Sequence, residues 1–204
     1  WNAQFSKYNH VWGEAPSKTA EVALSLFRER KVNRILIPGS GYGRNSRLFS
    51  TSGFDATGVE ISDEACALAR AYDPGTRLYN GSFLESDFDR GPYQGIYCFN
   101  VLQLFLKADR IRFVRKSAEL LSPGGLMFFT GISDRDASYG QGAEVEENTF
   151  AVQPDKNLHY FTPDDLKRHF EDFTVLEVGD LEDQVSHSLY GLKSYQIRYI
   201  LASI

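Results

Sequence analysis

Short apolar runs alternate with helical patterns along the first two thirds of the chain. The runs cover residues 34–38, 56–61, 76–79, 95–101 and 126–131, of which the third is the weakest. Continuous apolar runs of this length are typical of strands buried on both faces of a sheet. Helical patterns separate most of them, beginning near Arg44, after Ser62 and near Asp109. The alternation predicts an α/β fold, in which helices cover both faces of a mostly parallel sheet.

The pattern changes towards the C-terminal side. Thr162, Pro163 and Asp164 form a strong helix start, and this helix is expected to run to about Phe170. Residues 173–178 and 194–201 then read as two strands, which brings the predicted sheet to seven. Because no helix separates these two strands, we expect them to pair antiparallel. The longest irregular stretch, residues 132–161, is too long to be a mere connection.

The chain has 204 residues, which suits one domain. Lys and Arg number 22 and Asp and Glu number 27, giving a net charge of −5 without a basic stretch, so a nucleic-acid partner is not expected. No apolar run of about 20 residues predicts a membrane span, and a cytoplasmic location is expected. Cys66 and Cys98 lie in apolar runs and are expected to be reduced core residues; no metal-ligand spacing is present, so a metal-free site is expected.

A glycine-rich turn follows the first predicted strand. Gly39 and Gly41 let the backbone turn sharply and approach a ligand without a Cβ in the way, next to the start of a helix. The dinucleotide pattern G-x-G-x-x-G fails because its third glycine falls on Arg44. The spacing present is G-x-G-x-G, through Gly43, which suits a ligand with an amino-acid carboxylate. The alternative is an ordinary tight turn.

Polar and apolar side chains follow three further strands at their carboxyl ends. Glu60 ends the second strand, where an acid accepts hydrogen bonds from ribose hydroxyls, and Ile61 beside it can lie against an adenine. Ser82 and Phe83 follow the third strand and offer a polar group and a ring to the adenine. Asn100 ends the fourth strand. Four strand ends are therefore expected to meet at one groove, although Glu60 could instead be a solvated acid at a strand end.

Four sequence motifs carry a family resemblance. Residues 37–41 (IPGSG) resemble V-P-G-C-G, residues 41–46 (GYGRNS) resemble G-N-G-R-N-S, residues 58–62 (GVEIS) resemble G-[LV]-D-[IL]-S, and residues 160–166 (YFTPDDL) resemble the usual start of the late helix. Over nearly its whole length the chain thus resembles the class I S-adenosylmethionine-dependent methyltransferases, in particular the tellurite-resistance, thiopurine and thiol/halide branch.

The resemblance implies a single Rossmann-like methyltransferase domain over residues 1–204, with an N-terminal cap segment and first helix in residues 1–30 and a substrate-side insertion in residues 132–161. It implies S-adenosyl-L-methionine as cofactor and in-line methyl transfer to an oxygen, nitrogen or sulfur atom of a small organic molecule. The cofactor-binding residues implied are Trp12, Gly39, Ser40, Gly41, Glu60, Ile61, Ser82, Phe83 and Asn100. Many family members have an acid where Ile37 stands and an Asp where Ser82 stands. Trp12 belongs to a segment that covers the cofactor in these families; an arm that simply docks on the core is the alternative.

Methyl transfer needs a base only if the acceptor must lose a proton. Candidates for that role are His10, Tyr8, Tyr139 and His159, of which Tyr139 and His159 are the predicted catalytic residues. The predicted acceptor contacts are Tyr8, Gln103, Tyr139 and His159. The alternative is that Gln103 caps a strand end and that His159 packs against the late helix. The acids at positions 134, 136, 144, 146 and 147 form either a solvated loop or a rim that attracts a cationic amine.

Two other classes of function stay open. One is a regulatory protein that binds the cofactor without turnover. The other is a nucleotide-dependent oxidoreductase, against which the missing third glycine argues. The sequence leaves open the acceptor atom and whether the protein is a monomer or a dimer.

Overall fold

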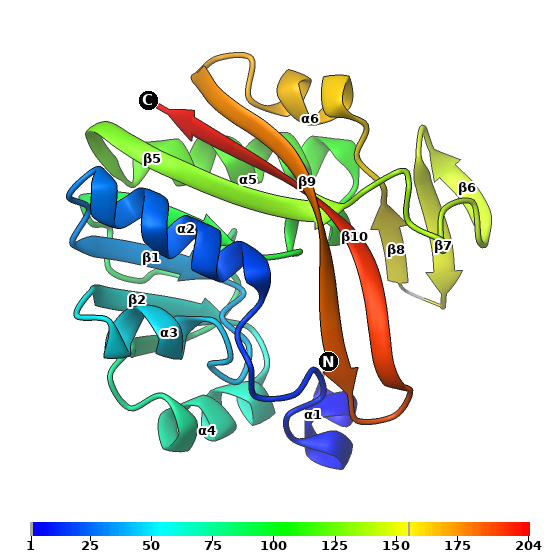
Figure 1. Cartoon of the computed structure of the whole chain (residues 1–204), viewed down its shortest axis with the longest axis horizontal. Helices are drawn as coiled ribbons and strands as arrows, with labels where there is room; N and C mark the ends of the chain where they lie inside the picture. The colour runs from blue at the N-terminus through cyan, green and yellow to red at the C-terminus, as the bar shows by residue number, and fades with distance from the viewer. Residues whose placement is uncertain (1, 155) are drawn as a thin grey trace.

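The computed structural model describes residues 2–154 and 156–204, and a seven-stranded sheet forms its centre (Figure 1). The strands of this sheet are β1 (Arg34–Pro38), β2 (Asp55–Glu60), β3 (Arg77–Asn80), β4 (Tyr93–Cys98), β5 (Leu121–Ile132), β9 (Thr174–His187) and β10 (Gly191–Ser203). Their order is β3-β2-β1-β4-β5-β10-β9. Strands β1 to β5 pair in parallel, and β10 is antiparallel to both of its neighbours. The predicted mostly parallel sheet with an antiparallel C-terminal strand is confirmed.

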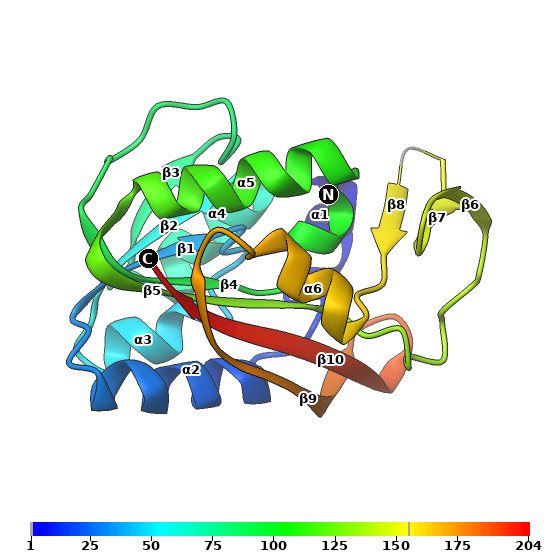
Figure 2. The same ribbon diagram turned by 90° about the horizontal axis from the view of Figure 1, so that it is seen from above.

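Six α-helices accompany the sheet in the described part of the chain. They are α1 (Asn2–Tyr8), α2 (Lys18–Glu29), α3 (Ser46–Thr51), α4 (Asp63–Tyr72), α5 (Lys107–Glu119) and α6 (Pro163–His169). Side-chain oxygens of Ser17, Ser62 and Thr162 accept from backbone N–H groups at the starts of α2, α4 and α6, as N-caps do. Helices α2 and α3 lie on one face of the sheet and α5 on the other (Figure 2).

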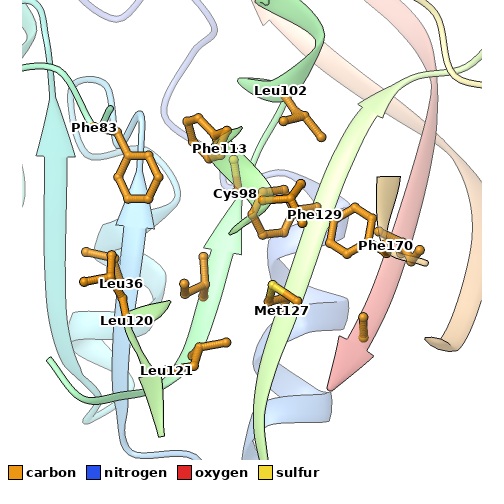
Figure 3. Close-up of a cluster of buried hydrophobic side chains, with 14 of the residues drawn as sticks. Leu36, Phe83, Cys98, Leu102, Phe113, Leu120, Leu121, Met127, Phe129 and Phe170 are labelled. Atoms are coloured by element: carbon orange, nitrogen blue, oxygen red, sulfur yellow. The ribbon is translucent and has the colours of Figure 1, made fainter. Parts of the chain in front are cut away.

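Alternate residues of the central strands pack into two separate hydrophobic cores, one on each face of the sheet. Cys98 of β4 and Phe129 of β5 pack with Phe113 of α5 (Figure 3), whereas Tyr97 and Phe128 pack on the α2 face. This alternation is what the two-residue period of a strand produces when both faces are covered. Both cysteines, Cys66 and Cys98, are buried and free, as the sequence predicted.

The stretch from 132 to 161 is more regular than its sequence suggests. It holds a separate three-stranded antiparallel sheet of β6 (Ala143–Glu146), β7 (Thr149–Gln153) and β8 (Lys156–His159). The expectation of an irregular stretch is therefore wrong. A small apolar cluster of Ile132, Phe150 and Tyr160 joins this sheet to the carboxyl end of β5, so packing compensates for the weak periodicity of the short strands.

The β9–β10 hairpin is longer than the sheet that it joins. Strand β5 pairs with β10 as far as Ile132 opposite Ile197, and residues 182–196 then project past the carboxyl ends of the parallel strands. We call residues 182–196 the projecting hairpin. At its tip Ser188 donates its backbone N–H to the Val11 carbonyl at 2.9 Å and its hydroxyl to the His10 carbonyl at 3.0 Å. The hairpin tip and the N-terminal segment (residues 2–17) therefore meet at this edge of the molecule (Figure 1).

Candidate functional site

The glycine-rich turn leaves β1 in a conformation that favours glycine. Gly39 and Gly41 have φ values of +66° and +60°. A Cβ on Gly39 would lie 2.3 Å from Cγ2 of Val101, just after β4, whereas a Cβ on Gly41 would meet nothing within 4 Å. The turn therefore touches the end of β4 on one side and borders open space on the other.

Glu60 ties the end of β2 to this turn. One carboxylate oxygen accepts from the Gly41 N–H at 2.9 Å and the other from the Ser62 N–H at 2.8 Å. The residue is only 7% exposed, which excludes a solvated acid. Burial raises the pKa of Glu60, and the N–H groups of Ser62 and Gly41 oppose this rise. The carboxylate thus forms part of the floor where β1 and β2 end.

The end of β3 reaches the same place. The Gly81 N–H and the Asn80 side-chain amide both donate to the Glu60 carbonyl, at 2.8 Å and 3.1 Å. Ile61 is 61% exposed beside Glu60, so an apolar side chain is available to a flat ligand. Ser82 is partly exposed.

The expectation for the Phe83 ring is wrong. Phe83 is buried, and its ring centroid lies 4.3 Å from that of Phe113 in the α5-side core (Figure 3). The ring therefore packs in the core and is not available to an adenine. Its direction follows from the apolar surface of α5, which the local sequence does not reveal.

Asn100 completes the convergence of strand ends. It follows β4 with a φ of +54°, and both its backbone N–H and its side-chain oxygen are hydrogen bonded to the hydroxyl of Thr130 in β5. The contact between Gly39 and Val101 places this segment against the glycine-rich turn. The ends of β1, β2, β3 and β4 therefore meet, as the sequence predicted, where the strand order reverses.

The N-terminal segment docks on the glycine-rich turn. The rings of Trp12 and Tyr42 stack with 6.3 Å between centroids and 11° between planes, and His10 stacks on Tyr42 at 4.9 Å. Arg44 donates to the Trp12 carbonyl at 3.1 Å, and the Tyr42 hydroxyl donates to the Gly13 carbonyl. The sequence missed Tyr42 and Arg44. A large aromatic residue inside a glycine-rich turn was the signal that could have identified Tyr42.

His159 is not an accessible base. It is 1% exposed, and its ring nitrogens are hydrogen bonded to Thr149 Oγ1 at 2.8 Å and to Asp165 Oδ2 at 2.7 Å. The predicted catalytic and acceptor-binding role of His159 is therefore wrong. The alternative, packing against the late helix α6, describes it correctly.

The other predicted acceptor contacts do not form one cluster. Gln103 is buried in a short 3₁₀ turn (Leu102–Leu104), and its Oε1 accepts from the Ile132 N–H at 2.7 Å, so it caps the end of β5. Tyr139 is 42% exposed; its hydroxyl donates to Asn148 Oδ1 at 2.7 Å and its ring packs on Phe150. Tyr8 packs in the cluster of the N-terminal segment. Tyr8 and Tyr139 thus remain partly exposed but lie in different surroundings.

Most of the acids between residues 134 and 147 have structural partners. Asp134 pairs with Arg198 at 2.7 Å, Asp136 accepts from the N–H groups of Ser138 and Gln196, and Glu146 accepts from the Lys107 N–H. Neither a solvated loop nor a rim for a cationic amine describes these three residues. In the described ranges, no helix is long and apolar enough to cross a membrane.

Comparison with known proteins agrees with this geometry. Residues 11–177 match a family described as "Methyltransferase domain". The match covers more than half of the chain, so the chain belongs to this methyltransferase family. With its sheet order and its glycine-rich turn, it is a class I S-adenosylmethionine-dependent methyltransferase.

Individual relatives are distant. The chain is 24% identical over 182 residues to the ubiquinone biosynthesis O-methyltransferase of Shewanella pealeana, covering 84% of this chain and 76% of the relative. The corresponding protein of Nitrosospira multiformis is 27% identical over 179 residues, covering 82% and 74%. Among solved structures, Burkholderia thailandensis 1,6-didemethyltoxoflavin-N1-methyltransferase has a TM-score of 0.69 at 18% identity, covering 98% of this chain and 84% of that one. TehB of Haemophilus influenzae has a TM-score of 0.67 at 15% identity, covering 99% and 66%.

The residues around the glycine-rich turn fit S-adenosylmethionine. A Cβ on Gly41 would enter open space, which leaves room for a ligand there. The Ser40 hydroxyl is buried against Gly58 of β2 and has no hydrogen-bond partner among the described residues. Glu60 offers carboxylate oxygens, and Ile61 offers exposed apolar surface.

Alanine substitutions at the two glycines of the turn are expected to have different effects. Either one costs about 1–2 kcal/mol of left-handed strain, but Gly39→Ala also places a Cβ 2.3 Å from Val101 and is expected to lower the melting temperature further. Gly41→Ala meets no such clash. It is expected to weaken binding of S-adenosylhomocysteine by about tenfold or more, because its Cβ enters the ligand space. Thermal unfolding and calorimetric titration of both variants check this. A Gly41→Ala protein that binds as tightly as the wild type would show that the ligand lies elsewhere.

Proposed function

We propose that this protein transfers a methyl group from S-adenosylmethionine to an oxygen, nitrogen or sulfur atom of a small organic molecule. The observation that carries the proposal is the meeting of four strand ends around Gly41 and Glu60, in a chain that belongs to a methyltransferase family. The curated relatives in Shewanella and Nitrosospira are O-methyltransferases by name, which supports a small acceptor.

In the proposed function the chain's own residues bind and orient. When bound, the cofactor supplies a methyl group on a sulfonium, which is already an activated leaving group. Glu60 accepts hydrogen bonds from the ribose hydroxyls, Ile61 lies against the adenine, and the backbone around Gly41 faces the amino-acid part. Positioning of this kind, together with exclusion of water, is sufficient to speed an in-line transfer.

The burial of His159 bears on the acceptor. Without this histidine, the remaining side chains proposed for the acceptor side include the partly exposed Tyr8 and Tyr139. The neutral hydroxyl of a tyrosine is a poor proton acceptor. The site therefore favours acceptors whose nucleophilic atom is unprotonated or readily loses its proton, such as amines, thiols and acidic phenols.

The surroundings of the groove support a small acceptor. The N-terminal segment lies on the glycine-rich turn through Trp12, and the projecting hairpin meets it at Ser188. In this proposal the two segments, with the β6–β8 sheet as the substrate-side insertion, surround the acceptor and keep water out. A cytoplasmic location, the absence of a nucleic-acid partner and the oligomeric state stay predictions.

Turnover with a panel of small acceptors tests the proposal. Protein, S-adenosylmethionine and one acceptor each from the thiols, amines, phenols and halides are incubated, and S-adenosylhomocysteine is measured by mass spectrometry. We expect product with at least one class, and less product with the Glu60→Ala variant at the same protein concentration and a limiting concentration of S-adenosylmethionine. Binding without turnover, with the panel and with a cell extract, would favour the regulatory alternative. Calorimetric binding of NAD would favour the oxidoreductase.

A further inference from the structure

A single buried hydroxyl connects β5 to the segment that follows β4. Thr130 is 1% exposed. Its Oγ1 accepts from the Asn100 backbone N–H at 3.0 Å and donates to Asn100 Oδ1 at 2.8 Å. In the described ranges, this hydroxyl makes no other hydrogen bond. Thr130 therefore holds both the backbone and the side chain of Asn100, at a residue whose φ of +54° needs such support.

The Thr130 hydroxyl also decides how the Asn100 amide is oriented. A hydroxyl has one proton to donate, and a buried hydroxyl needs an acceptor for it. The backbone N–H of Asn100 is a donor, so the proton must go to the side-chain oxygen of Asn100. The flipped amide would turn its NH₂ group towards Thr130 and leave the hydroxyl proton unpaired. The Oδ1 atom consequently faces β5, and the Nδ2 group is left for other partners.

The Nδ2 group of Asn100 is a hydrogen-bond donor beside the glycine-rich turn. Across the described chain it has no hydrogen-bond partner, and the residue is only half-buried. The segment that carries it touches the glycine-rich turn through Val101 and Gly39. With the ribose held at Glu60, at the end of β2, the cofactor's other end extends over the turn towards β4. Of the polar groups at that end, the ammonium can only donate, whereas the carboxylate accepts.

We propose that Thr130 is a positioning residue that fixes the amide of Asn100 so that its Nδ2 donates to the cofactor carboxylate. The inference rests on the proposed function, because it takes S-adenosylmethionine as the ligand. It adds a residue of β5 that has no direct contact with the ligand. The hydroxyl acts by fixing the orientation of the Asn100 amide, so that Nδ2 and not Oδ1 faces the cofactor.

Two ligands that differ in the amino-acid part test this inference by calorimetry. S-adenosylhomocysteine carries the carboxylate, and 5′-methylthioadenosine lacks the whole amino-acid part. We expect Thr130→Val to weaken S-adenosylhomocysteine binding by about tenfold, as the loss of one hydrogen bond to a charged group does. Binding of 5′-methylthioadenosine should stay within about twofold. Thr130→Ser keeps the hydroxyl and should restore binding of S-adenosylhomocysteine.

Two further variants distinguish the loss of this contact from a general effect on folding. Asn100→Asp keeps the shape of the side chain but replaces the donor with a carboxylate, so it should weaken S-adenosylhomocysteine by about tenfold or more and spare 5′-methylthioadenosine. Thr57→Val removes another buried threonine hydroxyl, from β2, and should leave both affinities unchanged.

Three results would overturn the inference: wild-type affinity in Thr130→Val, equal weakening of both ligands in Thr130→Val, or no rescue by serine. A wild-type protein that binds neither ligand would overturn the proposed function as well. Selective loss of the carboxylate contact is therefore distinguishable from the absence of a cofactor site.

Discussion

Replacing Glu60 with alanine is expected to weaken S-adenosylhomocysteine binding by about 10- to 150-fold. This range corresponds to about 1.5–3 kcal/mol, the usual contribution of hydrogen bonds to a charged group. The structure adds a second reason. The Glu60 carboxylate also accepts from the N–H groups of Gly41 and Ser62, so its loss releases the turn and the start of α4 together. Isothermal titration calorimetry on the wild type and the variant measures the difference.

A neighbouring acid provides the control for this experiment. Glu64 lies exposed in the first turn of α4, and Glu64→Ala should bind within about twofold of the wild type. Melting curves of both variants separate a loosened turn from a lost ligand contact. Agreement within twofold between the wild type and Glu60→Ala would rule out the ribose assignment.

The second large effect is expected from pH, through a buried cluster that joins α5, α6 and the β6–β8 sheet. Arg110 Nε donates to His169 Nε2 at 3.0 Å, and His169 Nδ1 therefore carries the ring proton that it donates to the Asp165 carbonyl at 2.8 Å. His159 bonds to Asp165 Oδ2, and Glu146 lies 3.6 Å from Arg110. Protonation of His169 would break the bond from Arg110 and place two cations side by side.

The direction of the pH effect follows from these contacts. Burial lowers the pKa of His159 below 6.5; Asp165 opposes this change and Arg110 adds to it. Burial likewise lowers the pKa of His169. Asp165 raises this pKa in part, and Arg110 lowers it further. The unfolded chain therefore binds more protons than the folded one below pH 6.5. The stabilising contribution of the two neutral histidines is fully present above this pH. Below it, the free energy of unfolding falls by up to about 1.4 kcal/mol per pH unit for each histidine.

Asp165 contributes at lower pH. Burial would raise the pKa of its carboxyl, but His159, His169 and Arg110 outweigh this and lower it below 3.8. Its contribution to stability is present above pH 3.8 and is lost below it. The contribution of Asp165 is therefore constant between pH 6.5 and pH 5, where the contributions of His159 and His169 change.

Urea unfolding at pH 7.5, 6.5, 5.5 and 5.0 tests this effect of pH. We expect His169→Gln, whose side-chain oxygen can still accept from Arg110, to be less stable at pH 7.5 but to lose about half as much stability on acidification as the wild type. Thr57→Val, which lies outside the cluster and removes no titratable group, should keep the wild-type slope. An identical slope in His169→Gln would contradict the assignment of this histidine.

The sheet could be predicted because its signals are local. Residues 34–38 form β1 as expected, and Ser62 and Thr162 cap the helices that they were expected to cap. The position of Glu60 follows from the same logic, since an acid at the end of a buried strand in a parallel sheet must lie at the functional edge. These conclusions need only the period of the apolar residues and the chemistry of helix ends.

The predictions that proved wrong concern residues whose contacts are distant in the sequence. The role of His159 is decided by Thr149 and Asp165, and the direction of the Phe83 ring by Phe113. The strands of the β6–β8 sheet are four or five residues long, too short for a clear period, and are stabilised where the sheet packs at the end of β5. Tertiary contacts override local propensity at such positions.

The sheet order has a consequence for how the protein is made. Strand β10 follows β9 in the chain but lies between β5 and β9, and in the described residues β9 pairs with no strand of the sheet except β10. While a ribosome is still making residues 191–203, β9 has no edge to join, so no paired strand yet holds Ser188 at Val11 and His10. The floor of the groove around Gly41 and Glu60 needs only residues already synthesised. The nascent chain can thus form the floor around Gly41 and Glu60 before it can form the projecting hairpin.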